Sequence, residues 1–258
     1  MISIAIANQK GGVGKTTTAI NIATAMAATG WKTLLLDLDP QGNASTGLGL
    51  PSVQRTQTSY DLLLEGLPVE ECLFPTSIPN LALLPATVDL SGAELELVAE
   101  ENRAERLREA LAAHRGHDIC FIDCPPSLGL LTLNALTAAD TLLIPLQCEF
   151  FALEGLSQLL QTVERVQGRF NPDLWIIGIA LTMFDRRNRL TDQVADDVRE
   201  CLGNLVFESV IPRNVRLSEA PSHGLPALVY DHSCAGSRAY MALARELIRR
   251  LPKERKAA

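Results

Sequence analysis

The chain opens with Ile2-Ser3-Ile4-Ala5-Ile6-Ala7-Asn8-Gln9-Lys10-Gly11-Gly12-Val13-Gly14-Lys15-Thr16-Thr17, an apolar run followed by closely spaced glycines and a Lys-Thr pair. A buried strand that enters a glycine-rich turn and then a helix is a common way for proteins to bind the phosphates of a nucleotide. Glycines let backbone N–H groups approach phosphate oxygens and permit positive φ values. The stretch therefore predicts a nucleoside triphosphate site near the start of the chain.

The residues after the glycines have distinct expected roles. A helix from about Lys15 to Ala28 points its partially positive N-terminus at the anion, and Lys15 adds a full charge between the terminal phosphates. The Thr16 hydroxyl is expected to contact Mg²⁺. The common motif has glycine six residues before the lysine, where this chain has Gln9, and Lys10 comes next. The expected phosphate-binding residues are Lys10, Gly11, Gly12, Val13, Gly14, Lys15, Thr16 and Thr17.

Two further apolar runs end in acidic residues. The run Thr33-Leu34-Leu35-Leu36-Asp37-Leu38-Asp39 places two acids in like orientation, because strand side chains repeat every two residues. Asp39 is the candidate for positioning the attacking water and assisting Mg²⁺, with Asp37 in support. The run Ile119–Asp123 predicts a strand whose last carboxylate holds Mg²⁺ through water. The expected catalytic residues are Lys10, Asp37, Asp39 and Asp123, and the expected metal site comprises Thr16, Asp39 and Asp123.

The rest of the sequence alternates strand-like and helix-like segments. This order predicts an α/β fold with a mostly parallel twisted sheet covered by helices on both faces, in a single domain over residues 1–258. Strands are expected at Ile2–Ala7, Thr33–Asp37, Leu81–Leu84, Ile119–Asp123, Thr141–Leu146, Trp175–Phe184 and Leu205–Ile211. Beyond the first helix, helical periodicity predicts helices at Leu95–Leu111, Leu153–Val163, Val194–Leu202 and Ala239–Leu251.

Composition favours a compact cytoplasmic protein. The chain has 258 residues, of which 47% are hydrophobic and 21% charged, so it can bury a full core. It has no run of about 18 apolar, uncharged residues and no basic, apolar leader. The six cysteines lack a paired CxxC spacing, which predicts free thiols in a reducing compartment.

Four more motifs accompany the loop. They are Asp37-Leu38-Asp39-Pro40-Gln41-Gly42-Asn43, Asp123-Cys124-Pro125-Pro126-Ser127, the run from Pro145 to Gly155, and Ile211-Pro212-Arg213-Asn214-Val215-Arg216-Leu217-Ser218-Glu219-Ala220-Pro221. With these motifs the chain resembles the ParA/Soj chromosome-partitioning ATPases, which carry the Lys-Gly-Gly-x-Gly-Lys-Thr-Thr loop of the deviant Walker A proteins in the ParA/MinD superfamily. The resemblance covers the chain to about Leu251. A first strand at Ile2 resembles the short chromosomal members, so no N-terminal helix-turn-helix extension is expected.

The resemblance implies an ATP-dependent switch with slow basal hydrolysis. In this family ATP and Mg²⁺ close two subunits face to face, the homodimer binds DNA without sequence preference, and a ParB-type partner stimulates hydrolysis and release. Lys10 would then cross the dimer interface to the phosphates of the other subunit, as an arginine finger does. The location would be cytoplasmic and nucleoid-associated. Carried over by motif position, the expected adenine pocket comprises Met183, Pro212, Arg213 and Asn214.

A DNA-binding face has to be reconciled with a net charge of −7. Local basic clusters matter more than the total, because charges are screened beyond about 8 Å at physiological salt. The segment Asp185-Arg186-Arg187 matches a family segment whose arginine contacts DNA, so Arg187 and Arg216 are the expected DNA-binding residues. Further basic residues toward the C-terminus are Arg213, Arg238, Arg245, Arg249, Arg250, Lys253, Arg255 and Lys256.

Other members of the superfamily provide alternative hypotheses. A division-site positioning ATPase of the MinD or MipZ type shares the loop, and MinD ends in a membrane-binding amphipathic helix. The stripe from Leu243 to Leu251 lacks bulky aromatics and is interrupted at Pro252, so core packing is favoured and membrane binding is not expected. Iron–sulfur carriers also share the loop, but a cluster at Cys120 and Cys124 would compete with phosphate chemistry. A colourless purified protein would exclude that class.

Overall fold

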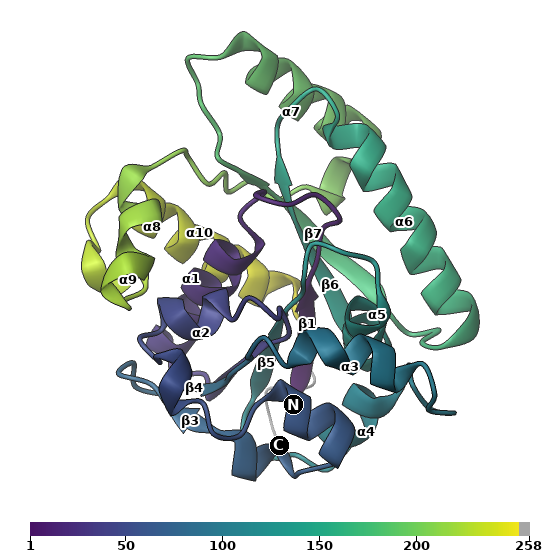
Figure 1. Cartoon of the computed structure of the whole chain (residues 1–258). Helices are drawn as coiled ribbons and strands as arrows, with labels where there is room; N and C mark the ends of the chain where they lie inside the picture. Colours follow the sequence, from purple (N-terminus) through teal and green to yellow (C-terminus); the bar gives the residue numbers. More distant parts are fainter. Residues whose placement is uncertain (253–258) are drawn as a thin grey trace.

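A single sheet forms the centre of the computed structural model, which describes residues 1–252 (Figure 1). The strand order is β3-β4-β2-β5-β1-β6-β7, and neighbours run parallel except β3 and β4. The predicted α/β fold with a mostly parallel sheet is therefore confirmed. The strands are β1 Ile2–Ile6, β2 Thr33–Asp37, β3 Phe74–Pro75, β4 Leu81–Leu84, β5 Ile119–Asp123, β6 Thr141–Gln147 and β7 Trp175–Thr182.

Helices cover both faces of the sheet (Figure 1). One layer contains α1, α2, α8, α9 and α10, and the other contains α3, α4, α5, α6 and α7. The helices are α1 Lys15–Ala28, α2 Asn43–Gly47, α3 Leu90–Leu97, α4 Arg106–Ala112, α5 Leu130–Ala138, α6 Ala152–Arg169, α7 Arg189–Leu202, α8 Val215–Glu219, α9 Ala227–Tyr230 and α10 Ala235–Arg250. Short 3₁₀ or π turns occupy Ser52–Gln54, Asp61–Glu65, Val69–Cys72, Gly203–Leu205 and Ala220–His223.

The two core layers follow from strand alternation. In β1, Ile4 packs on the α1 side and Ala5 packs on the α5 side. In β5, Phe121 lies on the α1 side, so Asp123 two residues later has the same orientation. Asp123 also pairs in register with Ile6 of β1 and Asp37 of β2. The glycine loop and both strand-terminal acids thus meet at the carboxyl edge of the sheet, where ligands bind in open parallel sheets.

The single helix expected over Leu95–Leu111 is wrong. Helix α3 ends at Leu97 and α4 begins at Arg106, with turns between them. The Asn134 side chain of α5 stabilises this break, because it donates to Arg103 O at 2.7 Å and accepts from Leu107 N at 3.2 Å. Backbone groups freed by the break are therefore bonded to a side chain that is distant in sequence.

The strand expected over Leu205–Ile211 is also wrong. The segment makes two isolated parallel bridges to β7 and its extension, at Val206 with Ile179 and at Pro212 with Phe184. Between the bridges, the N–H groups of Glu208 and Ser209 donate to the Glu246 carboxylate of α10, at 2.9 and 3.0 Å. A helix side chain thus replaces the sheet as their hydrogen-bond partner.

Candidate nucleotide site

The glycine loop is fixed at its start by hydrogen bonds between the Asn8 side chain and the backbone. Asn8 donates to Pro145 O of β6 at 2.7 Å and accepts from Lys10 N at 3.0 Å. Gly12 and Gly14 have φ values of 74° and 86°, a region that favours glycine. The loop leads directly into α1, whose first residue is Lys15. Its backbone has the left-handed turns that a phosphate-binding loop requires.

Lys15 is a buried cation at this loop. It is 6% exposed, and its ammonium donates to Lys10 O at 3.0 Å. Burial lowers the pKa of Lys15, whereas the nearby Asp123, Cys124 and Asp39 side chains raise it. The Lys15 ammonium and the N-terminus of α1 favour a bound anion. The acids around Lys15 favour an anion that is accompanied by a metal cation.

Asp123 is completely buried beside Thr16 and Lys15, but neither carboxylate oxygen has a partner within hydrogen-bond distance among residues 1–252. Burial raises the pKa of Asp123 well above its usual value, as does the charge of Asp37, while the adjacent Thr16 hydroxyl and the Lys15 ammonium lower it. Leaving a buried carboxylate unbonded costs free energy unless a ligand satisfies it. A hydrated cation beside Thr16 fits this arrangement.

The same region favours Mg²⁺ over a metal held by protein alone. Mg²⁺ is usually bound through one or two carboxylates together with phosphates and water. Among residues 1–252, no group of three or more His, Cys, Asp or Glu side chains is arranged to hold a metal ion. Asp123, with Thr16 beside it, fits the ion as a partial ligand set that phosphate oxygens would complete.

Asp37 and Asp39 differ in their contacts, although the sequence suggests similar orientations. Both Asp37 oxygens are bonded: Oδ2 accepts from Ser45 N at 2.8 Å and Ser45 Oγ at 2.6 Å, and Oδ1 accepts from Asp39 N at 3.2 Å. Burial raises the pKa of Asp37 to about 6, partly offset by the Ser45 hydrogen bonds. Asp39 Oδ1 accepts from Gln41 N at 3.0 Å. Asp37 therefore anchors α2 to the end of β2.

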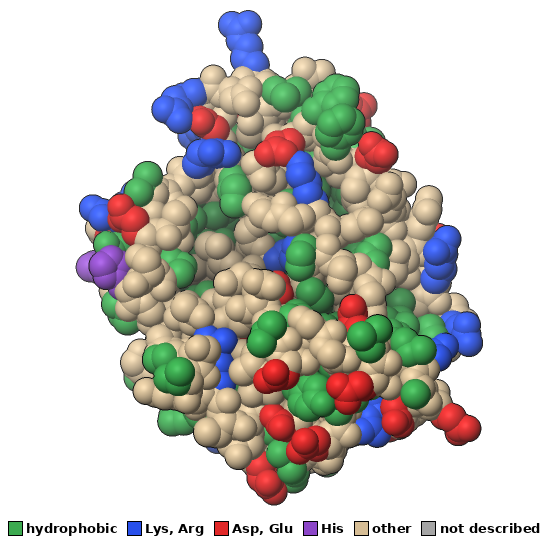
Figure 2. Space-filling view, in the orientation of Figure 1, with side chains coloured by type: hydrophobic (Ala, Val, Ile, Leu, Met, Phe, Trp, Pro, Cys, Tyr) green, Lys and Arg blue, Asp and Glu red, His purple; other side chains and the backbone are tan. Residues whose placement is uncertain are grey.

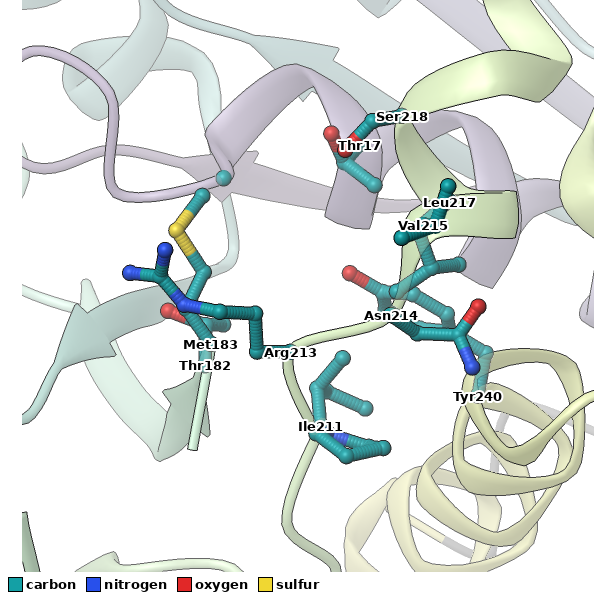
Figure 3. Close-up of a pocket in the computed structure, with 12 residues that line it drawn as sticks. Thr17, Thr182, Met183, Ile211, Arg213, Asn214, Val215, Leu217, Ser218 and Tyr240 are labelled. Carbon is teal, nitrogen blue, oxygen red and sulfur yellow. The ribbon is translucent and has the colours of Figure 1, made fainter. Parts of the chain in front are cut away.

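A pocket of about 280 Å³ lies beside the loop. Figure 3 shows Met183 and Arg213 on one side, with Asn214 and Tyr240 on the other. The four residues expected in the adenine pocket, Met183, Pro212, Arg213 and Asn214, all line it together with Gly14 and Thr17. The lining residues not expected from the sequence are Thr182, Ile211, Val215, Leu217, Ser218 and Tyr240.

Hydrogen bonds from distant elements hold the pocket against the loop. Thr182 Oγ1 at the end of β7 donates to Val13 O at 2.8 Å. Tyr240 of α10 shares a hydrogen bond of 3.1 Å with Thr18 of α1, and burial raises the pKa of Tyr240. Met183 has a φ of 49°, which is rare for a side chain of its size. Backbone strain of this kind concentrates at ligand sites.

Lys10 contacts its own chain. Its ammonium forms an ion pair with the Glu149 carboxylate, which follows the end of β6. Both side chains are about half exposed. The structure therefore separates the two lysines of the loop, since Lys15 lies inside the site and Lys10 lies at its surface.

The two arginines expected to bind DNA are on the surface and each is paired with an acid. Arg187 forms an ion pair with Asp185 at 2.8 Å, which lowers the pKa of Asp185 to about 2 through hydrogen bonds from Arg187. Arg216 pairs with Glu219 at 2.8 Å and with Asp231 at 3.6 Å. The basic residues Lys253, Arg255 and Lys256 lie outside the described residues.

Charges are unevenly distributed over the surface. Figure 2 shows acidic side chains gathered at the lower end of one face, over α3, α4 and the turns at Asp61–Glu65 and Val69–Cys72. Lys and Arg side chains lie at the upper end and the left, near α7 and α8, and along the right side near α6. The net charge of −7 is therefore compatible with a local basic region.

Comparison with known proteins identifies close relatives. Residues 1–176 match a family described as an AAA domain. The chain is 59% identical over 250 residues to chromosome partitioning protein ParA of Caulobacter vibrioides (strain NA1000 / CB15N), covering 96% of this chain and 94% of that protein. It is 53% identical over 249 residues to chromosome-partitioning ATPase Soj of Treponema pallidum (strain Nichols), covering 96% and 97%.

A solved structure shows the same architecture. Cobyrinic acid a,c-diamide synthase from Mycobacterium smegmatis, with bound ATP analog and magnesium, has a TM-score of 0.84 and 38% identity to this chain. The match covers 96% of this chain and 95% of that one. The fold is thus shared with a protein that holds both a nucleotide and the metal ion.

Proposed function

The chain belongs to the ParA/Soj family of chromosome-partitioning proteins, and on this basis we propose that it is an ATP-dependent DNA-partitioning switch. With ATP and Mg²⁺ bound, two copies of this single-domain chain close face to face, and the dimer binds DNA without sequence preference. A ParB-type partner accelerates the slow hydrolysis of ATP to ADP and phosphate, which releases the DNA. The protein acts in the cytoplasm, on the nucleoid.

The unpartnered carboxylate of Asp123 carries this proposal. It lies buried beside Thr16 and Lys15, at the end of a glycine loop, in a chain with chromosome-partitioning relatives. Mg²⁺, when bound, supplies charge neutralisation at the phosphates. Asp123, Thr16 and Asp39 hold the ion, and the backbone N–H groups of Gly11 to Thr17 hold the phosphate oxygens.

The remaining site residues have separate roles. Lys15 neutralises charge on the terminal phosphates from inside its own subunit, and Asp39 orients the attacking water. Lys10 of the other subunit also neutralises charge on these phosphates. Met183, Ile211 and Pro212 provide an apolar wall for the adenine ring, a usual arrangement for flat ligands.

DNA binding by Arg187 and Arg216 explains the lack of sequence preference. Both guanidinium groups are exposed, and arginine contacts to phosphates position a protein on DNA without reading bases. Each arginine must exchange an acid of its own chain for a DNA phosphate. Exposed ion pairs are weak, so this exchange has a small cost.

Of the division-site alternatives, the MinD type requires a membrane-binding helix, whereas the sequence separates the MipZ type only through the segment Pro212-Arg213-Asn214. The apolar side of α10 is buried in the core through Tyr240, Leu243 and Leu247. None of the helices formed by residues 1–252 has the length and apolar character needed to cross a bilayer. Partitioning is therefore the better-supported function, because the two relatives reported above are named as partitioning proteins.

The proposal is tested by DNA retention with ATP, with ADP and without nucleotide, each across a salt series. Retention should require ATP and fall steadily as salt increases, because phosphate contacts release counterions. Retention that is equal in ADP and ATP would contradict the switch. Addition of a ParB-type protein should increase phosphate release and shorten retention.

A further inference from the structure

Lys10 is held by a carboxylate of its own chain. Its ammonium pairs with Glu149, and the two side chains are 39% and 46% exposed. The Lys10 backbone is fixed separately, since its N–H donates to Asn8 Oδ1 at 3.0 Å and its carbonyl accepts from Lys15 Nζ at 3.0 Å. Within residues 1–252, the ion pair with Glu149 is the one polar contact that directs the Lys10 side chain.

The Glu149 backbone is also anchored. Glu149 N donates to Gln147 O at 2.9 Å, and Glu149 O accepts from Ala152 N at 2.8 Å at the start of α6. These bonds fix the segment between β6 and α6. Glu149 therefore stays in place if the pair opens, and the long, flexible lysine side chain is the part that moves.

This ion pair is suited to reversible exchange. Pairs exposed to this degree are weak, because water and salt screen them. A terminal phosphate carries more negative charge than one carboxylate, so it competes well for the ammonium. An anion in the same chain nevertheless has a high effective concentration and holds the lysine when no phosphate is near.

We propose that Glu149 is a resting counter-ion for Lys10, which keeps this lysine from engaging a second subunit until a triphosphate is present there. The inference rests on the proposed function, in which Lys10 contacts nucleotide across a symmetric dimer. Closure then breaks two Lys10–Glu149 pairs, one in each subunit. Glu149 acts through Lys10 as a positioning residue and makes closure of the dimer less favourable.

Sedimentation of the full chain tests the proposal. The dimer dissociation constant is measured with a non-hydrolysable ATP analogue and Mg²⁺, and again with ADP. With the analogue, Glu149→Gln should lower that constant by roughly 4- to 25-fold, because each exposed pair contributes roughly two- to fivefold and two pairs break. Glu149→Asp, which keeps the charge, should stay near wild type.

Two controls separate this role from a general effect of charge or structure. Glu154→Gln removes the same charge from an exposed position on α6 that has no ion pair with Lys10, and should leave the constant unchanged. In a Lys10→Ala background, Glu149→Gln should no longer tighten the dimer, since the pair is already absent. Persistent tightening there would contradict a role through Lys10.

The outcomes distinguish this inference from the proposed function. If the wild type dimerises with the analogue and Glu149→Gln dimerises equally well or more weakly, Glu149 is not a resting counter-ion. The proposed switch is unaffected by that result. A wild-type chain that stays monomeric with the analogue contradicts the switch, and the counter-ion role with it.

The resting pair is tested without nucleotide by chemical labelling. Acetic anhydride modifies exposed lysines, and mass spectrometry compares Lys10 with the exposed Lys32. An ammonium held against a carboxylate is less accessible to the reagent and reacts more slowly. Glu149→Gln should therefore increase the labelling of Lys10 relative to Lys32, and unchanged labelling would overturn the pair.

Discussion

At the scale of single residues, hydrogen bonding divides the buried acids into two kinds. Asp37 has both oxygens bonded, to Ser45 and to the backbone of Asp39. Asp123 has neither oxygen bonded within residues 1–252. An acid with satisfied oxygens holds the fold together, whereas an unsatisfied one is available to a cation. The spacing in the sequence does not reveal this difference.

Replacement of Asp39 should separate binding from turnover. Asp39→Ala is expected to reduce ATP hydrolysis by roughly 100- to 10,000-fold, since orienting a reactant contributes mainly in the transition state. Affinity for a non-hydrolysable analogue should fall far less than turnover, because Asp123 and Thr16 remain to hold the ion. Phosphate release and calorimetric binding measure the two quantities. The exposed Asp196→Ala serves as a control, and normal turnover in Asp39→Ala would exclude the role.

Local motifs predicted the residues of the site that are adjacent in the chain. The glycines, Lys15 and Asp123 were found because strand, turn and helix signals surround them. Thr182 and Tyr240 were not found, because packing brings them in from β7 and α10. From the sequence alone, Tyr240 is predicted to be one more core residue of an amphipathic helix. No local pattern indicates its contact with Thr18.

At the scale of elements, Arg250 joins α10 to the edge strand β7. Its guanidinium donates to Ile177 O at 3.0 Å and Val206 O at 3.1 Å, and it lies 4.0 Å above the Phe207 ring. It also pairs with Glu246, which binds the backbone of the same segment. This cluster explains why residues 206–212 follow α10 instead of extending the sheet.

Removal of this arginine should destabilise the fold. Arg250→Ala is expected to lower the free energy of unfolding by about 2–3 kcal/mol, because carbonyl groups lose a charged donor and Phe207 loses its cover. Urea unfolding followed by circular dichroism gives the value. The neighbouring exposed Arg249→Ala is the matched control. Equal stability of the two variants would contradict this stabilising role of Arg250.

A second cluster joins the Val69–Cys72 turn to the segment before β5. His114 contacts Glu70 at 2.5 Å through Nδ1 and His117 at 2.7 Å through Nε2. The His114 hydrogen bond lowers the pKa of Glu70 from 4.5. Burial lowers the pKa of His117 from 6.5, as do the nearby His114 and Lys32 charges, whereas Asp118 and Glu70 raise it.

The lowered pKa values of His117 and Glu70 predict that acid weakens this cluster, whereas the raised pKa values of Asp37 and Asp123 act in the opposite direction. A base with a lowered pKa takes up protons first in the unfolded chain, so its stability contribution is lost as pH falls below 6.5. An acid with a lowered pKa loses its contribution as pH falls below 4.5. The test is therefore the difference between variants in urea titrations from about pH 7.5 to about pH 5. As pH falls over this range, His117→Asn should lose less unfolding free energy than the wild type, or gain more, whereas exposed His232→Asn should follow the wild type.

The sequence predicted the buried strands well because continuous apolar runs mark them. The two elements that it placed wrongly, at Leu95–Leu111 and Leu205–Ile211, have a common cause, which is a side chain from another element hydrogen bonding to the backbone. Asn134 does so between α3 and α4, and Glu246 does so beside β7. Periodicity reports which face is apolar and contains no information on such distant partners.

At the scale of the whole molecule, charge is separated along the surface (Figure 2). Of the two proposed DNA contacts, Arg187 is more exposed than Arg216, with 87% of its side chain accessible. A dimer would present each arginine twice. Local positive regions can therefore bind a polyanion even though the total charge is negative.

Charge reversal at Arg187 should weaken DNA binding selectively. Arg187→Glu is expected to reduce affinity roughly tenfold and to lower the salt slope by about one, with ATP-analogue affinity unchanged. Fluorescence anisotropy over a salt series measures both quantities. Arg165→Glu, at an exposed position on α6, makes the same charge change on another element. Equal effects of the two variants would indicate a general charge effect.

The nucleotide pocket contains residues from both ends of the described chain, since Gly14 and Thr17 face Tyr240. Thr18 and Tyr240 are bonded across 222 positions of sequence. Ribosomes deliver the chain from its N-terminus, so a nascent polypeptide that has emerged only through β7 lacks one wall of the pocket. During translation the glycine loop therefore cannot hold a nucleotide as the finished protein does. A newly made chain can therefore form the complete pocket only after α10 has docked.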